Sequence, residues 1–314
     1  MLTRRHIRVK VLQSLYAFEN QENNDLKKQE KFLIESMTNM HDLYLLMLQL
    51  PIAIREQALS YMEKSKNKFL ATSLEKSPSV NFIENRVLLQ LENNNILKNL
   101  ITNKKLAHWE LDDEYPKILF KELRKSEKYS KYLELKQTNY AQDKEFVLFL
   151  FKEIIAPNEK LYEYLEDKQI TWIDDYPIVN TAIVKLLENF SPHTTPAACV
   201  PDLFKNTDDK EFSISLLEKT IVNEEFLSNE IEGRTPNWDK ERIAELDLML
   251  IKMGITEFLH FPSIPTRVTI NEYIEIAKEY STPKSSLFIN GIMDKLVKEY
   301  DSKGMLNKSG RGVK

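Results

Sequence analysis

Glycine is scarce in this chain, with 6 among 314 residues, and cysteine occurs once, at Cys199. So few glycines disfavour tight hairpins and glycine-rich nucleotide-binding loops. One cysteine cannot form an internal disulfide or a multi-cysteine zinc site, and it fits a reducing compartment. No apolar run approaches the roughly 20 residues that cross a bilayer, and the start of the chain lacks a signal-peptide pattern. These absences predict a cytoplasmic protein with no membrane partner.

Leucine, lysine, glutamate, isoleucine and asparagine fill the chain, with tyrosine and phenylalanine as bulky packing residues. This composition favours helix over strand and predicts an all-α fold. The clearest helix covers 4–20, where Ile7, Val11 and Leu15 recur every fourth residue and form one apolar face. Further helices are expected over 26–64 with a break or kink at Pro51, and over 80–104, 116–137, 175–190 and 239–258.

Both ends of the chain are basic although the formal net charge is −4. The first 20 residues hold one acid, Glu19, and the residues after Asp301 hold none. The basic side chains of the two ends are Arg4, Arg5, Arg8, Lys10, Lys303, Lys308, Arg311 and Lys314. An acidic middle with basic ends predicts localised binding of an anionic partner rather than a protein that coats nucleic acid.

Four side chains with basic groups lie where the first helix begins: Arg4, Arg5, His6 and Arg8. Cations there oppose the partial positive charge of the helix N-terminus, so helix stability alone does not explain them. Arg4 and Arg8, one turn apart, are expected on the polar side of the helix. Together with the unpaired N–H groups of the helix start they would form a good phosphate site. A solvated, frayed terminus explains the same residues about equally well.

A segment that starts at Asp143 is repeated without a gap from Asp209. The residues that coincide include Asp143/Asp209, Phe146/Phe212, Ile155/Ile221, Leu161/Leu227 and Trp172/Trp238. A match of this length predicts a duplicated helical unit, with 143–190 as a copy of 209–258.

A linker with three prolines, over 191–204, is the best candidate boundary in the chain. The predicted parts are N-terminal helices over 1–64, a helical insertion over 65–200, a C-terminal subdomain over 205–300 and a flexible basic tail over 301–314.

The C-terminal subdomain carries the strongest local signals. Thr269 and Glu272 form a capping-box pattern, and Thr282-Pro283 predicts the start of the next helix. That helix has Gly291 in its interior. An interior glycine costs up to about 1 kcal/mol relative to alanine, so a close helix–helix approach or a partner contact is expected to require Gly291.

No residue pattern of an enzyme stands out. His193 and His260 have no partner at metal-ligand spacing, and no pair of carboxylates is singled out. GxGxxG, Walker A, GxSxG and HExxH patterns do not occur. The sequence therefore predicts no catalytic residue, no metal site and no enzymatic activity.

Two segments together resemble the NusB family. The opening RRHIRVKVLQSLYAF resembles the family's arginine-rich first helix, and HFPSIPTRVTINEYIEIAKEYSTPKSSLFINGIMDKL resembles its closing helices. The stretch NWDKERIAELDLMLIKMGITEFL resembles the helix before them. The block from I-N-E to N-G-x-x-D-K is specific, whereas the arginine-rich start alone is not. Residues 1–60 and 205–300 account for the family pattern, and roughly 65–200 are extra.

The resemblance implies a NusB-like bundle of two helical subdomains, here with a large helical insertion that contains the partial duplication. It implies no catalytic activity and no cofactor. The implied partners are boxA-type single-stranded RNA of ribosomal RNA leaders, a NusE-type small-subunit ribosomal protein and the RNA polymerase antitermination complex, with a homodimer as a further possibility.

Site residues also follow from the resemblance, position by position. The implied RNA-binding residues are Arg4, Arg5, His6, Arg8, Phe288, Asn290, Asp294 and Lys295. Tyr16 and Glu257 match positions near the ribosomal-protein contact. Lys284 and Leu287 depart from the pattern, because better-known members carry an acidic and a basic residue there. The closing helix is therefore expected to contact RNA in its own way.

Two other functions remain open at this point. A protein-interaction scaffold would keep the fold without binding RNA directly, and the acidic middle of the chain favours it. An RNA-modifying enzyme with a similar helical domain would need a glycine-bearing nucleotide-binding domain, which this sequence lacks. The resemblance therefore favours an antitermination factor, with the scaffold as the alternative.

Overall fold

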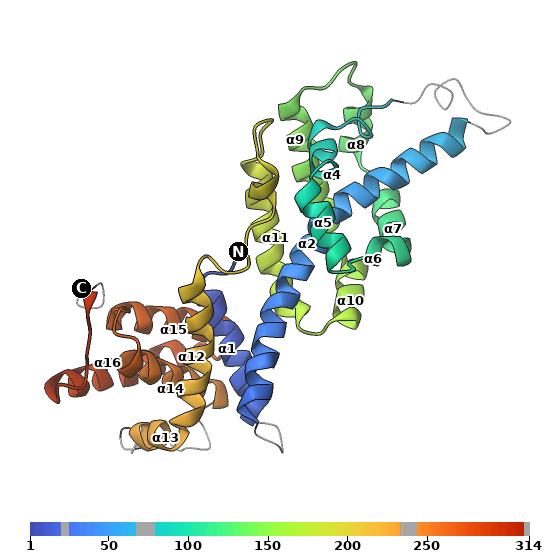
Figure 1. The fold of residues 1–314 in the computed structure, drawn as a ribbon. Helices are drawn as coiled ribbons and strands as arrows, with labels where there is room; N and C mark the ends of the chain where they lie inside the picture. The colour runs from blue at the N-terminus through green and yellow to red at the C-terminus, as the bar shows by residue number, and fades with distance from the viewer. Residues whose placement is uncertain (20–24, 67–78, 233, 235–243, 311–314) are drawn as a thin grey trace. The chain divides into compact units, whose positions relative to one another are not determined.

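The computed structural model describes residues 1–314 except 20–24, 67–78, 233, 235–243 and 311–314. The described residues form helices joined by short turns, and none of them lies in a strand (Figure 1). The predicted all-α fold is confirmed. Among these residues no helix combines the length and the apolar character that spanning a bilayer requires.

The helices pack as two compact units. Unit 1 contains 1–37 and 203–314, and unit 2 contains 38–202. The helix α2 (Leu26–Lys66) runs through Pro51 without ending there, and it contributes residues to both units. The first boundary therefore falls inside α2, whereas the sequence placed it near residue 64. A boundary inside a continuous helix leaves no proline, glycine or charge signal in the sequence.

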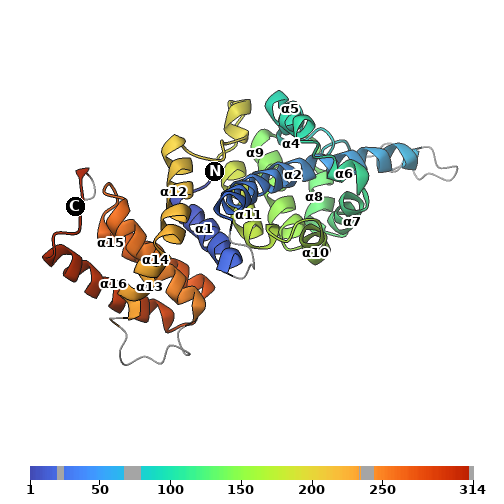
Figure 2. The same ribbon diagram turned by 60° about the horizontal axis from the view of Figure 1, so that its bottom comes forward.

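Unit 1 is built around α14. Its helices are α1 (Arg4–Glu19), the start of α2, α12 (Thr207–Val222), α13 (Glu224–Glu232), α14 (Glu245–His260), α15 (Thr266–Tyr280) and α16 (Ser285–Ser302). All residues from Met249 to Phe258 of α14 are buried. A helix that is buried on every side needs neighbours all round, and α1, α12, α13, α15 and α16 all pack against α14 (Figures 1 and 2).

Glycine has a packing role at one of the two helical positions in unit 1. A Cβ on Gly254 of α14 would overlap with Cε of Met293 on α16 and would lie 3.2 Å from its Sδ. Gly254 therefore permits the close approach of α14 and α16. A Cβ on Gly291 would have no atom within 4 Å. The prediction that helix packing requires Gly291 is therefore wrong, and only the predicted partner contact remains for it.

Replacing Gly291 with alanine is expected to stabilise the chain by up to about 1 kcal/mol, because alanine favours the helical backbone and the site has room for a methyl group. Chemical denaturation followed by circular dichroism measures the change. Gly254→Ala is the matched variant and is expected to shift the midpoint in the opposite direction. A loss of stability in Gly291→Ala would show that the open space around Gly291 is not present in solution.

The chain after α16 folds back onto unit 1. The Nζ of Lys308 donates to the carbonyl oxygens of Glu257 at 3.2 Å and Phe261 at 3.0 Å, and the Ser309 amide donates to the carbonyl oxygen of Pro262. Burial lowers the pKa of Lys308. These contacts hold the chain up to Ser309 against unit 1 in the structure, while Arg311 and Lys314 lie outside the described residues, and the flexibility of the tail stays a prediction.

Unit 2 consists of the rest of α2 and a series of short helices. They are α4 (Arg86–Glu92), α5 (Asn95–Asn103), α6 (His108–Leu111), α7 (Glu114–Leu123), α8 (Glu127–Glu134), α9 (Tyr140–Phe149), the π-helix Leu150–Ile155, α10 (Glu159–Lys168), α11 (Trp172–Glu188) and the 3-10 helix Pro196–Cys199. Several begin at side chains that accept a hydrogen bond from the first turn, namely Asn85, Asn94, Ser126, Asn139 and Asn158. These caps divide two long predicted helices, 80–104 and 116–137, into shorter ones.

The predicted duplication has a counterpart in local structure. Asp143 of α9 and Asp209 of α12 are both buried, and each binds the first residue of another helix. Arg86 of α4 donates to Asp143 at 2.8 Å, and Arg4 of α1 donates to Asp209 at 3.0 Å. The corresponding helices pack as α4 on α9 and α1 on α12. This parallel supports the duplication, although Trp238 lies outside the described residues.

Candidate functional site

The candidate site is the start of α1, which is held by unit 1 itself. The Thr3 hydroxyl accepts from the His6 amide at 3.3 Å, and the Thr3 amide donates to Nδ1 of His6 at 3.3 Å. Arg4 Nε donates to Asp209 Oδ1 at 3.0 Å, and the guanidinium lies 5.0 Å from the ring centre of Phe212. The Arg4 side chain is still 39% exposed. Arg4 is therefore fixed in position and accessible at the same time.

Arg5 forms a two-point contact with α15. Its Nε and Nη2 donate to the two carboxylate oxygens of Glu272 at 3.0 and 2.9 Å, and the Arg5 side chain is 38% exposed. The hydrogen bond to Glu272 raises the pKa of Arg5, with the charges of Glu275 and Glu279 adding to it, and the same bond lowers the pKa of Glu272. α15 therefore places carboxylates next to the basic start of α1.

Arg8 lies inside unit 1 and binds Glu257 of α14. Its Nε and Nη2 donate to Glu257 at 2.6 and 2.9 Å, and the Arg8 side chain is 2% exposed. Glu257 also accepts from the hydroxyls of Thr269 at 3.1 Å and Tyr273 at 2.7 Å. Burial alone would lower the pKa of Arg8. The charge and hydrogen bonds of Glu257 outweigh this effect, so the pKa of Arg8 is raised. The network links α1, α14 and α15.

Three residues of the predicted site lie inside unit 1. Arg8, Glu257 and Phe288 are all buried, so their contact with RNA or a partner protein stays a prediction. The physical reason for Arg8 is that α1 packs against α12, α14 and α15, and this enclosure buries more of the helix than its apolar stripe indicates. Thr269 is likewise no helix cap, because α15 begins at Thr266 and Thr269 turns inward to Glu257.

The other predicted residues are accessible to different degrees. His6 is partly buried, and burial followed by the charge of Arg5 lowers its pKa, so its imidazole is neutral near pH 7. Tyr16 is exposed on α1. On α16, Asn290 is partly buried, and Asp294 and Lys295 are exposed. These side chains remain candidates for partner contacts.

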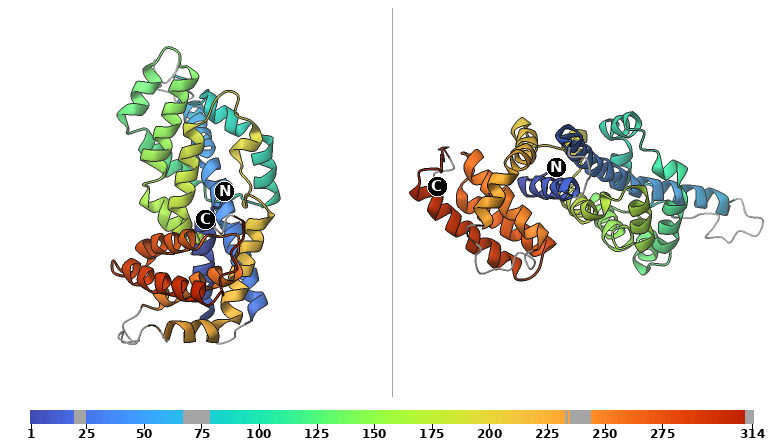
Figure 3. Two further views of the ribbon diagram at one scale, coloured as in Figure 1. Left: turned by 90° about the vertical axis from the view of Figure 1, so that its left-hand side faces the viewer. Right: turned by 90° about the horizontal axis from the view of Figure 1, so that it is seen from below.

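The predicted RNA-binding residues lie on α1 and α16, and both helices pack against α14 and α15. α1 packs against α12, α14 and α15, and α16 packs against α14 and α15 (Figure 3). The residue of α15 that meets the start of α1 is an acid, Glu272. The basic start of α1 therefore lies directly beside an acidic side chain of α15.

A cavity that the sequence did not indicate lies between α1, α12 and α14. It has a volume of about 290 Å³, and Leu15, Phe18, Thr220, Ile221 and Met249 line it together with a charged group. In that group, Lys252 binds Glu224 at 2.6 Å and Glu19 at 3.5 Å, and burial raises the pKa of Glu19. Lys252, a charged residue in the otherwise apolar middle of α14, is a sequence signal that could have indicated it.

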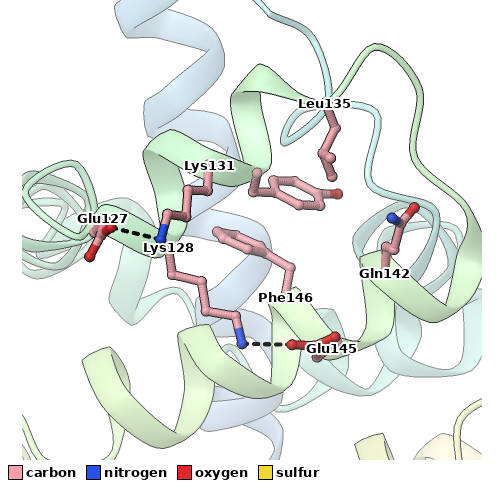
Figure 4. Close-up of a pocket in the computed structure, with 8 residues that line it drawn as sticks. Glu127, Lys128, Lys131, Leu135, Gln142, Glu145 and Phe146 are labelled. Atoms are coloured by element: carbon pink, nitrogen blue, oxygen red, sulfur yellow. Dashed lines mark hydrogen bonds and ion pairs between the residues drawn. The ribbon is translucent and has the colours of Figure 1, made fainter.

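Unit 2 has a larger groove of about 420 Å³ between α8 and α9 (Figure 4). Tyr132 and Phe146 stack there with ring centres 4.1 Å apart, and both are buried. Lys128 binds Glu145, and Lys131 binds Glu127, so the charges at the rim are balanced. Buried rings and balanced charges do not suit this groove to stacking on RNA bases.

Among the described residues no group of three or more histidine, cysteine, aspartate or glutamate side chains is placed to hold a metal ion. The NusB family model matches residues 182–298. The transcription antitermination protein NusB of Salinibacter ruber is 39% identical over 111 residues, which cover 35% of this chain and 69% of that protein. The chain belongs to the NusB family.

Two further relatives carry the same name. NusB of Chloroherpeton thalassium is 41% identical over 112 residues, 36% of this chain and 53% of that protein. NusB of Thermodesulfovibrio yellowstonii is 41% identical over 95 residues, 30% of this chain and 63% of that protein. The chain thus spans between about half and two thirds of the length of these curated relatives. No solved structure matches the chain.

The region matched to the NusB family contains α12 to α15 and most of α16, and with them the carboxylates that hold α1. Asp209, Glu257 and Glu272 lie within it, and their partners Arg4, Arg8 and Arg5 lie outside it. The NusB portion of the structure therefore determines the position of the arginine-rich start.

Proposed function

We propose that the chain is an RNA-binding transcription antitermination factor without enzymatic activity. In this proposal it binds boxA-type single-stranded RNA together with a NusE-type ribosomal protein and joins the RNA polymerase antitermination complex. Membership of the NusB family supports the role, as do the names of the three relatives.

The observation that carries RNA binding is the pair of exposed arginines at the start of α1. A guanidinium has five N–H donors, of which Arg4 uses one on Asp209 and Arg5 uses two on Glu272. The remaining donors point to no protein acceptor in the described structure. Held by these carboxylates, both side chains keep one geometry and can still donate to phosphate oxygens. So few phosphate contacts predict modest affinity that falls with salt.

Replacing Arg4 and Arg5 with alanine is expected to weaken binding of a boxA-type RNA oligonucleotide by about tenfold, because two phosphate contacts are lost. Fluorescence anisotropy at several salt concentrations measures this, and the variant should show a smaller salt dependence than the parent. Arg8 is left intact because its loss would disrupt the interior of unit 1. The surface variant Lys28→Ala/Lys31→Ala removes the same charge from exposed positions of α2 and serves as the control.

A third variant separates charge from geometry. Glu272→Gln removes the carboxylate beside Arg5 and is expected to strengthen RNA binding, since a negative charge no longer faces the phosphates. RNA affinities that are equal in the parent, in Arg4→Ala/Arg5→Ala and in Glu272→Gln would contradict the proposal.

A scaffold of the same fold without direct RNA binding is the second candidate. The carboxylates that already bind Arg4 and Arg5 favour it, because RNA would have to approach Asp209 and Glu272 as well. In that case the ribosomal protein would bind equally well with and without RNA, and the exposed Tyr16 would be part of the contact. Titration of the ribosomal protein into the parent and into Tyr16→Ala, each with and without RNA, distinguishes the two candidates.

A further inference from the structure

Unit 2 exposes two large apolar side chains on segments that contact one another. Leu111, the last residue of α6, is 81% exposed, and Ile170, in the turn between α10 and α11, is 66% exposed. Exposing apolar surface of this size to water costs free energy, and a partner that covered the two side chains would recover it. Both lie outside the buried core of unit 2 and are available to a partner.

Both side chains are carried by segments that are fixed on α2. Three residues before Leu111, the ring of His108 lies 6.0 Å from the ring of Trp172, which is two residues after Ile170. The indole N–H of Trp172 donates to the carbonyl oxygen of Asn39 at 2.7 Å. Trp109 makes the same kind of bond to Leu46 at 2.8 Å. The two tryptophans thus hold the segments in place on one side of α2.

Polar contacts join the end of α6 to α10. Asp112, next to Leu111, accepts from the Tyr164 hydroxyl at 2.7 Å and from Lys168 at 3.0 Å. The rings of Tyr115 and Tyr164 lie 4.1 Å apart. Because Tyr164 is buried and Asp112 is partly buried, the surface is preformed and a partner would order little on binding it.

The border of this surface is acidic. Glu110, Glu114, Glu166 and Asp167 are exposed, and none of them forms an ion pair within the described part of the chain. The nearby basic side chains are engaged, since Lys168 binds Asp112 and Lys117 binds Asp113. After burial, it is the charges of Glu114, Asp112 and Asp167 that raise the pKa of Tyr115, which shows that carboxylates of α7 and α10 share one neighbourhood.

We propose that Leu111 and Ile170, with Glu110, Glu114, Glu166 and Asp167 around them, form a docking surface for a basic amphipathic segment of a partner protein. Apolar side chains of that segment would cover Leu111 and Ile170, and its lysines and arginines would pair with the free carboxylates. Phosphates would be repelled by the same carboxylates, so this surface is distinct from the RNA site proposed on unit 1.

The probe is a labelled helical peptide of about 18 residues with leucine on one face and lysine and arginine on the other. The full chain is expected to bind it more tightly than a peptide of the same composition without an apolar face. Leu111→Ser/Ile170→Ser is expected to weaken binding about fivefold to tenfold, because the covered apolar area is lost. Replacing the four carboxylates with their amides is expected to weaken binding similarly and to remove most of its salt dependence.

Ile96→Ser/Leu135→Ser is the matched control, since both are exposed apolar side chains of unit 2 away from this surface. It should bind the peptide as the parent does. Equal weakening in the control, or equal binding of the two peptides, would overturn the proposal. So would self-association of the parent in sedimentation that disappears in Leu111→Ser/Ile170→Ser, which would make the occupant a second copy.

Discussion

Replacing Glu257 with leucine is expected to lower the free energy of unfolding of unit 1 by about 3–5 kcal/mol. The variant leaves Arg8 charged and buried without its carboxylate, and it removes the acceptor of the Thr269 and Tyr273 hydroxyls. Removing one partner of a buried ion pair is costly because the remaining charge has lost its water, and Arg8 would keep only the longer contact of its Nη1 to Glu272 at 3.5 Å. Hydrogen exchange of the buried amides of α14 and denaturant titration measure the loss.

Two further variants test the cause. Arg8→Met combined with Glu257→Leu removes both charges and is expected to be more stable than Glu257→Leu alone. Glu275→Gln breaks an exposed pair with Lys278 on α15 and is expected to leave the unfolding midpoint unchanged. If Glu257→Leu behaved like Glu275→Gln, the buried network would not hold α1 against α14 and α15.

The helices were largely predictable because their causes are local. The apolar spacing of α1 and the asparagines that cap the helices of unit 2 are visible within a few residues of sequence. The division of 80–104 at Asn94 and of 116–137 at Ser126 follows from the same local rule, since each side chain accepts from the first turn of a new helix. Local sequence does not show which of two possible roles a residue has, such as a contact to a ligand or a contact inside the fold.

The site shows where that choice depends on distant residues. Arg8 has the chemistry of a phosphate contact, but its carboxylate partner is 249 residues away in the sequence. Thr269 and Glu272 match a capping box, yet their partners are Glu257 and Arg5. A single sequence does not contain these pairings, because they arise from the packing of α14 against its neighbours. Arg4 and Arg5 remain in the proposal because their pairing leaves them partly exposed.

The second large effect is expected in unit 2, at the counterpart of Asp209. Replacing Asp143 with alanine is expected to lower the free energy of unfolding of unit 2 by about 2–4 kcal/mol. Asp143 is fully buried and accepts from the Tyr132 hydroxyl at 2.7 Å, from the Arg86 amide at 3.0 Å and from the Arg86 guanidinium at 2.8 Å. Arg86 is partly exposed and can recover water, so the main loss comes from the buried Tyr132 hydroxyl, which as a donor keeps only the longer contact to the Asn81 carbonyl oxygen at 3.3 Å.

Asp209→Ala provides the comparison inside the same molecule. Asp209 binds a single side chain, the exposed Arg4, so its loss is expected to cost less than that of Asp143. Hydrogen exchange of amides in α4 and α9 for Asp143→Ala, and in α1 and α12 for Asp209→Ala, measures each change where it occurs. In a Tyr132→Phe background the effect of Asp143→Ala should shrink, because the hydroxyl that needs an acceptor is gone. Equal losses for the two alanine variants would mean that the duplicated arginine–aspartate contact, and not the tyrosine that unit 2 adds to it, determines the stability of both copies.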